Sequence, residues 1–593
     1  SMVTSLTDNS IAPYGKLQLY HRSNYHWYLK TELRYDDHSV QSSSALVSRA
    51  IFSPEDPYKL TIALRRQNSG DDILEWREYC FRWDSSNVYS HYQQSTALAM
   101  SVDGKKLNFT PLDKAMVPPP MCAGFVELPA PVVGITSRPS FYHDSPSQEG
   151  ERKIEFLITM SNGKIALLQS GGKVKSANTM VHGFSPPSLA ATIDLETVTC
   201  LVGERETASL QATCLRDLTI IDADGDSYTA VALYSPQASQ NQHHNFDNLV
   251  EMKISWRDSQ SEQVDVDVTI TELLQLESRA LRIVNWEDTA YAPGARGSAL
   301  IELNDGMLLE YNQGGAIEAC EAGPILEACP SIAGIFDAHS NEISATAPIA
   351  DGEACHDVHS KRLVVGLSSR YRLYCGERLL SSASSSFEVS LSHKFITHVT
   401  IGSRPHLHFL PIESLRDFDP FTESDNHAVL DGYEPRLVER GARLVSIFPS
   451  MPSLVLQMPR GNLEGISPRG LVLPYVMTKI QNGEIQEAFD IMRRQRVDLN
   501  LIVDLNPSNF LSCVADQLIC QIEKIDNINL FISSLIDVDS TFKYPVPSWI
   551  RQGIPGATNT YGDDSKVNVV CGKMRELMLT AESDSVTSSG NAV

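Results

Sequence analysis

The sequence predicts a mainly β protein with an α extension: a WD-type β-propeller of about seven blades, followed by the start of an α-solenoid. Three observations lead to this prediction. Short apolar runs alternate with turn residues from about residue 16 to 458, without a sustained helical period. After residue 466 the apolar residues follow the 3.6-residue period of helices. The β region is also too long for one sandwich, which favours a propeller.

Two dipeptides mark hairpins in the β region. Asn162-Gly163 and Asp305-Gly306 each separate two strand-like runs, and such pairs are strong signals for a tight hairpin turn. The only Trp-Asp dipeptide of the chain is Trp83-Asp84, so the blade repeat is degenerate. Polar stretches at 36–44, 143–152, 235–248 and 418–426 are predicted to be inserted loops.

The helical region begins with Ser467-Pro468, which is typical of an N-cap and a first helical turn. Pro474 fits that helix badly, so the helix either kinks there or starts later. The next helix has one apolar face made of Ile485, Ala488, Phe489 and Met492. A third is predicted to start at Asn506-Pro507, with a break at Asp526-Asn527, and a last helix covers 565–579.

These patterns divide the chain into four parts. Residues 1–15 are predicted to be a tag remnant and a disordered lead-in, because Ser1 precedes Met2. The propeller is predicted over 16–462 and the first solenoid helices over 463–582. The polar tail, 583–593, is predicted to be disordered.

Four residues between the two regions are predicted to form a structural joint. Pro459 cannot donate a backbone hydrogen bond to a sheet, and Gly461 permits a turn. Arg460 can bridge several oxygen atoms, so it is expected to be buried and hydrogen-bonded, and Asn462 is the fourth residue of the joint. The short, mixed composition favours a fixed angle over a flexible linker.

Composition limits the partners. The net charge is −24 and the pI about 5.1, which opposes a phosphate-binding surface over the whole chain. Residues 492–496 (MRRQR) could form a local basic patch, but a solvated helix face is the favoured interpretation. The eleven cysteines include no CxxC pair, which indicates buried thiols in a reducing compartment. No apolar run is long enough for a membrane span, and no secretory signal is expected.

The sequence predicts no catalytic, cofactor-binding or metal-binding residues. The acidic stretch 222–227 lacks the Gly and Glu of a calcium loop, and a polar turn between strands is favoured. Cys355, His356 and His359 lack the two spaced pairs of a zinc site. His406 and His408 alternate on a predicted strand, so they share one face that is half exposed.

Several stretches resemble one family, the largest, scaffolding subunit of the Elongator complex (IKAP family). They are NYHWYLK (24–30), VPPPMC (117–122), LVERGARLV (437–445), MPRGNLE (458–464), EAFDIMRRQRVDLNLIVDLNP (487–507) and KVNVVCGKMRELM (566–578). The resemblance spans almost the whole chain in the correct order. It implies two tandem propellers and a long α-solenoid, of which this chain would hold the second propeller and the first helices.

The resemblance also implies a function. Elongator modifies wobble uridines of transfer RNA, and its chemistry belongs to a radical S-adenosylmethionine and acetyltransferase-like subunit. The subunit resembled here holds that catalytic subunit together with a second WD-repeat subunit, so a non-enzymatic scaffold without cofactors is expected. It forms a homodimer through a C-terminal region absent here. No nucleic-acid or membrane binding is expected of this chain, and the expected location is the cytoplasm, with the nucleus as a second location.

Two alternatives stay open at this point. Propellers followed by solenoids also occur in scaffold subunits of membrane coats and of intraflagellar transport, and architecture alone cannot separate these families. A propeller hydrolase is the less favoured alternative. It would need clustered ionisable side chains with shifted pKa values in the central channel.

Overall fold

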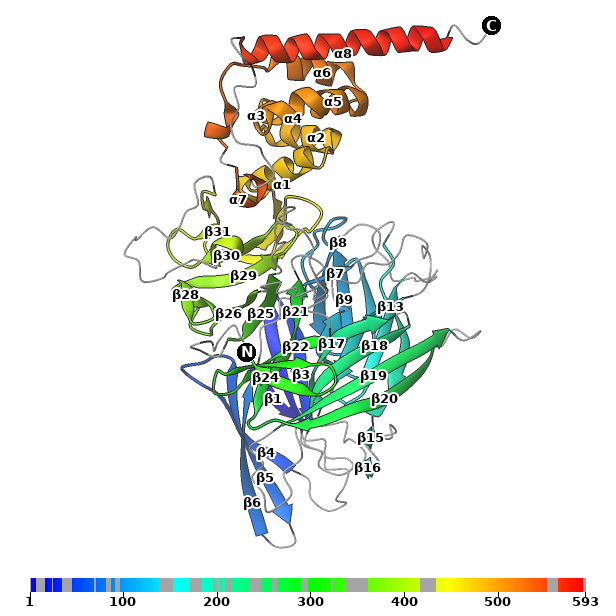
Figure 1. Ribbon diagram of the computed structural model, residues 1–593. Coiled ribbons are helices and arrows are strands. Elements are labelled where there is room, and N and C mark those ends of the chain that lie inside the picture. The colour runs from blue at the N-terminus through cyan, green and yellow to red at the C-terminus, as the bar shows by residue number, and fades with distance from the viewer. Residues whose placement is uncertain are drawn as a thin grey trace, which may run out of the picture.

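The computed structural model has a β region and a helical region stacked on one end of it (Figure 1). It describes residues 2–6, 16–23, 25–34, 45–68, 71–81, 87–90, 96–137, 153–170, 184–195, 200–202, 205–207, 215–224, 226–234, 247–258, 264–288, 297–320, 325, 327, 329–337, 361–415, 433–544, 546–551, 561 and 564–589. Within this part of the chain, the last strand ends at Ile466 and the first α-helix begins at Arg469.

Seven consecutive, mainly antiparallel sheets make up most of the described β region, and a parallel strand pair joins the fourth to the fifth. The first holds β7 (Asn87–Ser90), β8 (Thr96–Asp103), β9 (Lys106–Pro111) and β10 (Gly124–Glu127). The second holds β11 (Val132–Ser137), β12 (Lys153–Met160), β13 (Ile165–Ser170) and β14 (Ser188–Ile193). The third holds β17 (Leu215–Asp224), β18 (Ser227–Tyr234), β19 (Asn248–Asp258) and β20 (Val264–Gln275), and is extended by β15 (Cys200–Val202) and β16 (Arg205–Thr207).

The remaining four sheets follow in chain order. The fourth holds β21 (Ala280–Asp288), β22 (Ser298–Leu303), β23 (Leu308–Asn312) and β24 (Ala316–Ala319). The fifth holds β25 (Ser331–Asp337), β26 (Lys361–Leu367), β27 (Leu373–Cys375) and β28 (Arg378–Ser381), and β21 pairs with β25 in parallel. The sixth holds β29 (Ser384–Ser390), β30 (Phe395–Thr400), β31 (His406–Pro411) and β32 (Arg436–Leu437), and the seventh holds β33 (Arg443–Ile447), β34 (Leu454–Gln457) and β35 (Leu463–Ile466). A 3-10 turn, Glu413–Leu415, follows β31.

Apolar clusters join each sheet to the next and close the series into a ring. Six clusters lie in turn between sheets one and two, two and three, and onward to sheets six and seven. A seventh cluster joins Phe448 and Val455 of the last sheet to Ala97 and Leu112 of the first. A ring of sheets packed face to face removes the exposed sheet edges of an open stack, which is the stabilising principle of a propeller.

Two further sheets lie outside this ring. The first holds β1 (Met2–Leu6), β2 (Lys16–Ser23) and β3 (His26–Arg34). The second holds β4 (Ala45–Phe52), β5 (Lys59–Asn68) and β6 (Asp71–Cys80), and the two share their own apolar cluster. The Leu29 carbonyl accepts a hydrogen bond from the Gly104 amide, and the Leu29 amide donates to the Asp103 side chain at the β8–β9 turn. These two bonds attach β3 to the first sheet of the ring.

The N-terminal boundaries therefore differ from those expected from the sequence. The ring starts at β7 and not at residue 16. The strands of the two outer sheets have lengths and compositions like those of the ring, so the sequence pattern did not separate them from it. The predicted disordered lead-in, 1–15, includes β1, which pairs with β2 along its whole length. A pattern of apolar runs and turn residues predicts strands, but it does not predict which sheets pack together in one ring.

The predicted hairpins are confirmed. Gly163 lies between β12 and β13 and Gly306 between β22 and β23, and both glycines have positive φ angles, 76° and 87°. Positive φ is the conformation that a tight turn requires and that glycine adopts without strain. Asp224 pairs with Ser227 where the β17–β18 hairpin begins, so the described residues of the acidic stretch 222–227 lie at the adjoining ends of two strands, in agreement with the predicted polar turn. The predicted polar loops at 36–44, 143–152 and 418–426, and 235–246 of the fourth, lie outside the described residues.

Eight α-helices are described after the ring. They are α1 (Arg469–Gln481), α2 (Ile485–Gln495), α3 (Leu501–Asp504), α4 (Pro507–Asn509), α5 (Ala515–Gln521), α6 (Ile525–Ser533), α7 (Ser548–Arg551) and α8 (Lys566–Ser589). A π turn, Phe510–Val514, joins α4 to α5, and Ser540–Phe542 form a 3-10 turn. One apolar cluster, which includes all four predicted face residues of α2, holds these helices together. The Asn506 side chain accepts a bond from the Asn509 amide and caps α4 as predicted.

Several helix boundaries correct the sequence analysis. Residues 463–466 pair with β34, so they belong to a strand and not to the helical region. Pro468, and not Ser467, is the N-cap of α1, and Pro474 lies inside that helix. Asn527 is buried within α6, so no break occurs there. The predicted disordered tail is helical as far as Ser589, because α8 continues beyond its buried turns.

Candidate functional site

The four predicted joint residues form the turn between β34 and β35. The Gly461 amide donates to the Met458 carbonyl at 2.8 Å, and the Met458 amide donates to the Asn462 carbonyl at 2.8 Å. Gly461 has a φ of 89° and is buried, while Pro459 and Asn462 are exposed. The segment therefore serves as a hairpin turn of the seventh sheet.

Arg460 corrects the expectation for this segment. Its side chain is exposed, and it has no hydrogen bond or ion pair with any residue that the structure describes. A residue at the tip of a two-stranded turn faces solvent, because the strands on either side of it point the turn away from the core. The prediction that Arg460 is buried and hydrogen-bonded is wrong.

The contact between ring and helices is made by the first turn of α1. Two residues separate β35 from α1, and this connection is too short for the helix to move independently of the sheet. Gly470 faces Phe409 of β31, and a Cβ atom built at Gly470 would lie 2.7 Å from the nearest ring atom. Leu471 is completely buried among apolar side chains of the sixth and seventh sheets. Only glycine permits this approach of helix and sheet.

A polar network reinforces the same contact. The Tyr475 hydroxyl of α1 donates to the carbonyl of Ser450, at 2.7 Å, and lies 2.7 Å from a carboxylate oxygen of Glu487. The ring of Tyr475 stacks on His393, which follows β29, with 5.9 Å between centroids. Burial lowers the pKa of His393 to about 4, and its Nδ1 lies 2.8 Å from the Ser390 hydroxyl. The neutral imidazole is thus the form that the joint accommodates.

The short helix α7 adds a second contact between the two regions. The indole ring of Trp549 meets the ring of Phe395 edge to face, with 5.7 Å between centroids. The Gln481 side chain at the end of α1 donates to the carbonyl of Ile550 at 2.8 Å. The helical region therefore rests on the ring through two helices that are far apart in sequence (Figure 1).

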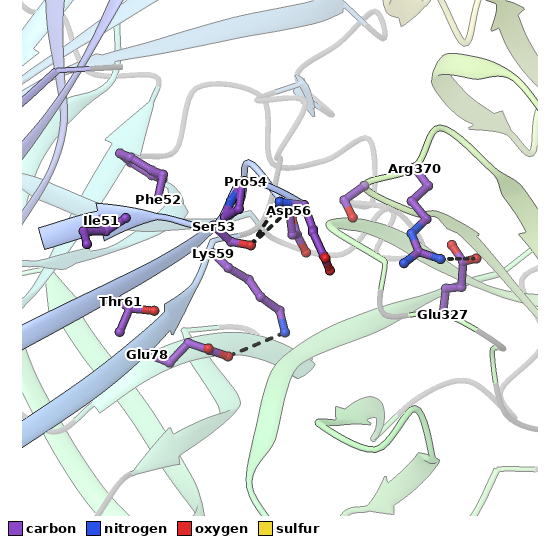
Figure 2. A pocket seen from close by; sticks show the side chains of 12 residues that line it. Ile51, Phe52, Ser53, Pro54, Asp56, Lys59, Thr61, Glu78, Glu327 and Arg370 are labelled. Atoms are coloured by element: carbon purple, nitrogen blue, oxygen red, sulfur yellow. Dashed lines mark hydrogen bonds and ion pairs between the residues drawn. The ribbon is translucent and has the colours of Figure 1, made fainter.

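A pocket of about 610 Å³ lies elsewhere, where the β4–β5 turn faces Glu327 and Arg370 of the fifth-sheet region (Figure 2). Its two cations are paired: Lys59 lies 3.5 Å from Glu78, and Arg370 lies 3.9 Å from Glu327. The residues that line it are Ile51, Phe52, Ser53, Pro54, Glu55, Asp56, Lys59, Thr61, Glu78, Glu327, Ser369 and Arg370. This set includes no histidine or cysteine to activate a nucleophile.

The remaining sequence candidates do not assemble into a site. No group of three or more His, Cys, Asp or Glu side chains in the described residues has the arrangement of a metal site. His406 and His408 do share one face of β31, and the ring of His408 stacks on His398 at 4.9 Å. Cys355, His356 and His359 lie outside the described residues. No helix in the part of the chain that the structure describes is both long and apolar enough to cross a membrane.

Comparison with known families decides the relationship. Residues 101–445, more than half of the chain, match the family model described as "ELP1 N-terminal second beta-propeller". Residues 469–589 match the model described as "ELP1 alpha-solenoid". The chain belongs to the ELP1 family. The predicted fold class, a β-propeller followed by the start of an α-solenoid, is confirmed.

Curated relatives agree with the ELP1 assignment. "Putative elongator complex protein 1" of Xenopus laevis is 27% identical over 573 residues, which cover 95% of this chain and 42% of that protein. "Elongator complex protein 1" of Mus musculus is 26% identical, covering 95% of this chain and 38% of that protein. The Saccharomyces cerevisiae protein of the same name is 27% identical, covering 89% and 32%. The chain thus spans about two fifths or less of these relatives.

The family assignment also decides between the earlier alternatives. The resemblance to the Elongator scaffold family is confirmed, in place of a membrane-coat or transport scaffold. The ELP1 propeller match begins at residue 101, within β8, which agrees with a ring that starts at β7. The ELP1 solenoid match begins at 469, where α1 begins.

Proposed function

We propose that this chain is a non-catalytic scaffold segment of an Elongator complex, which supports the modification of wobble uridines in transfer RNA. The observation that carries the proposal is the joint between ring and helices. Gly470, Leu471 and Trp549 hold the helical region against two sheets of the ring, so the two surfaces keep one relative orientation. A scaffold needs such a fixed orientation to position partners, because a loose linker would spend binding free energy on ordering.

The proposed partners are the radical S-adenosylmethionine and acetyltransferase-like catalytic subunit and the second WD-repeat subunit. Propeller rims and solenoid surfaces both bind other proteins well, since both are rigid and extended. Membership of the ELP1 family, whose curated relatives are named as Elongator components, supports this choice. We further propose a cytoplasmic location, also nuclear, and homodimerisation of the longer protein through a C-terminal region outside this chain.

Binding of the purified chain to each of the two partner subunits tests the proposal. Size-exclusion chromatography at two salt concentrations should show a complex with the catalytic subunit, alone or with the second WD-repeat subunit present. A variant that loosens the joint, Gly470→Val, should weaken a complex that contacts both regions, while Gly572→Val at an open position of α8 should not. Absence of any complex at low salt would contradict the proposal.

A further inference from the structure

Five cations near the end of α2 have no carboxylate partner among the residues that the structure describes. This cationic cluster consists of Arg469, Arg493, Arg494, Arg496 and Lys543, all exposed. Three lysines of the same helical region are paired in contrast. Lys479 contacts two glutamates, Lys566 contacts Asp504 and Lys573 contacts Glu576. Lys524, Arg551 and Arg575 also have no carboxylate partner among the described residues, so what distinguishes the cluster is that its members come together from different elements.

The cluster is assembled from three elements and not from one charge run. An Nη atom of Arg469, from α1, donates to the carbonyl of Arg496 at 3.3 Å. The Arg469 guanidinium and the Lys543 ammonium lie 5.9 and 5.2 Å from the ring centre of Tyr544, a buried residue whose hydroxyl accepts from the backbone amide of Asp498. Arg493 donates to the side-chain oxygen of Asn527 in α6 at 3.4 Å.

Helix termination explains only part of this arrangement. Arg493 and Arg494 lie in the last turn of α2, where cations interact favourably with the negative end of the helix dipole. Arg469 and Lys543 come from other elements, and that effect does not account for the contact of Arg469 with Arg496 or for the position of Lys543 beside Tyr544. The nearest acidic side chain in sequence, Asp498, accepts bonds from the backbone and side chain of Asn500.

We propose that the cationic cluster binds an acidic segment of a partner protein, whose carboxylates pair with its arginines. Guanidinium groups bind carboxylates through two parallel hydrogen bonds, and the Arg469 guanidinium is held in place for this by the Tyr544 ring and the Arg496 carbonyl. The inference rests on the proposed scaffold function only in assuming that the chain binds other proteins. The cationic cluster would be the surface that binds one of these partner proteins.

Two observations favour an acidic peptide over a nucleic acid. The chain carries 24 more negative than positive charges, so a long polyanion would be repelled wherever it extends past the five cations of the cluster. A short acidic segment can bind within the cluster and avoids this repulsion. Exposed apolar side chains also occur on the elements of the cluster and on the helix it contacts: Phe542, next to Lys543, is 89% exposed, and Ile525, at the start of α6, is 73% exposed. The segment is therefore expected to carry apolar residues among its acidic ones.

Fluorescence anisotropy with a labelled synthetic peptide of glutamate and phenylalanine tests the inference. The wild-type chain should bind this probe, more weakly at high salt. The triple variant Arg469→Gln/Arg496→Gln/Lys543→Gln should weaken binding about tenfold or more, since it removes several charge-assisted hydrogen bonds. The matched control Lys573→Gln/Arg575→Gln removes two positive charges of α8, a half-buried lysine and an exposed arginine, and should bind like wild type.

A second measurement works on the wild-type chain alone. Carbodiimide crosslinking joins carboxylates of the bound probe to nearby amines, and mass spectrometry should find the Lys543 side chain among the linked sites. No binding, unchanged binding of the triple variant, or tighter binding of a single-stranded RNA oligonucleotide through the same residues would each overturn the inference. These outcomes are independent of the complexes with whole subunits, so failure of either proposal is recognised separately.

Discussion

Gly470 shows how much one residue determines at the joint. Its Cα lies so close to Phe409 that an added Cβ would sit 2.7, 2.9 and 3.0 Å from three ring atoms. The ring belongs to a buried cluster and cannot move freely. A methyl group here must displace the helix or the ring, although alanine is the better helix former.

We predict that Gly470→Ala destabilises the chain by roughly 1–2 kcal/mol, because overpacking outweighs the gain in helix propensity. The matched control is Gly572→Ala in α8, where nothing lies within 4 Å of the new Cβ. That substitution should stabilise the chain by up to about 1 kcal/mol. Thermal unfolding followed by circular dichroism at a helical wavelength measures both. Equal shifts of the two variants would contradict the packing argument.

His393 makes stability depend on pH. Burial lowers its pKa to about 4 in the folded chain, below the usual value of 6.5. Between these two values the unfolded chain binds the proton more readily, so the contribution of His393 to stability is complete above about pH 6.5. It falls as the pH drops toward 4, by at most about 1.4 kcal/mol per pH unit.

We therefore predict that wild-type stability, measured by urea unfolding, falls between pH 7 and pH 5, and that His393→Gln reduces the fall. The difference arises because glutamine does not titrate. His406, which lies on β31 and is not fully buried, supplies the control variant His406→Gln. If His393→Gln and His406→Gln show the same pH dependence as the wild type, burial of His393 is not the cause.

At the scale of elements, the β34–β35 turn depends on its glycine and not on its arginine. Arg460 is exposed without a partner in the described residues, so Arg460→Ala should change the free energy of unfolding by no more than about 0.5 kcal/mol. Gly461 has a φ of 89°, so Gly461→Ala should cost about 1 kcal/mol or more. Urea unfolding of both variants measures the difference, and a larger loss for Arg460→Ala would contradict this assignment.

The first residue of α8 is held by a buried ion pair. The Lys566 ammonium lies 2.9 Å from a carboxylate oxygen of Asp504, in α3, and donates to the Val538 carbonyl at 2.7 Å. Lys566→Met should cost about 3–5 kcal/mol, because it leaves a buried carboxylate without its cation. The double variant Asp504→Leu/Lys566→Met should lose less than the sum of the two single variants. Urea unfolding of the four proteins completes this cycle, and strict additivity would contradict the pairing.

The sequence predicted elements better than it predicted their contacts. Asn162-Gly163 predicted a hairpin and Ile485 to Met492 predicted a helix face, because both signals are local. The joint depends on Gly470 meeting Phe409 and Trp549 meeting Phe395, which are far apart in sequence. A glycine in a helix, read alone, only lowers the helix propensity. The same limit explains why Arg460 was expected to be buried at the joint and why β2 to β6 were assigned to the ring.

At the scale of the whole molecule, ring closure and the joint act together. The helices rest on the sixth and seventh sheets, and the seventh is packed on the first through Phe448 and Val455. Movement of α1 would therefore disturb the seventh sheet and, through it, the first sheet of the ring. The propeller and the helices are expected to move as one body, although each has its own apolar core.

Small-angle X-ray scattering tests this rigidity. We predict that Leu471→Ser increases the radius of gyration and the maximum dimension, because it places a hydroxyl in the fully buried contact between α1 and the ring. The far-ultraviolet circular dichroism spectrum should stay unchanged, since the helices keep their own core. Leu579→Ser on α8, where the leucine is 57% exposed, is the matched control and should scatter like the wild type. Identical curves for Leu471→Ser and the wild type would mean that this contact does not set the angle between ring and helices.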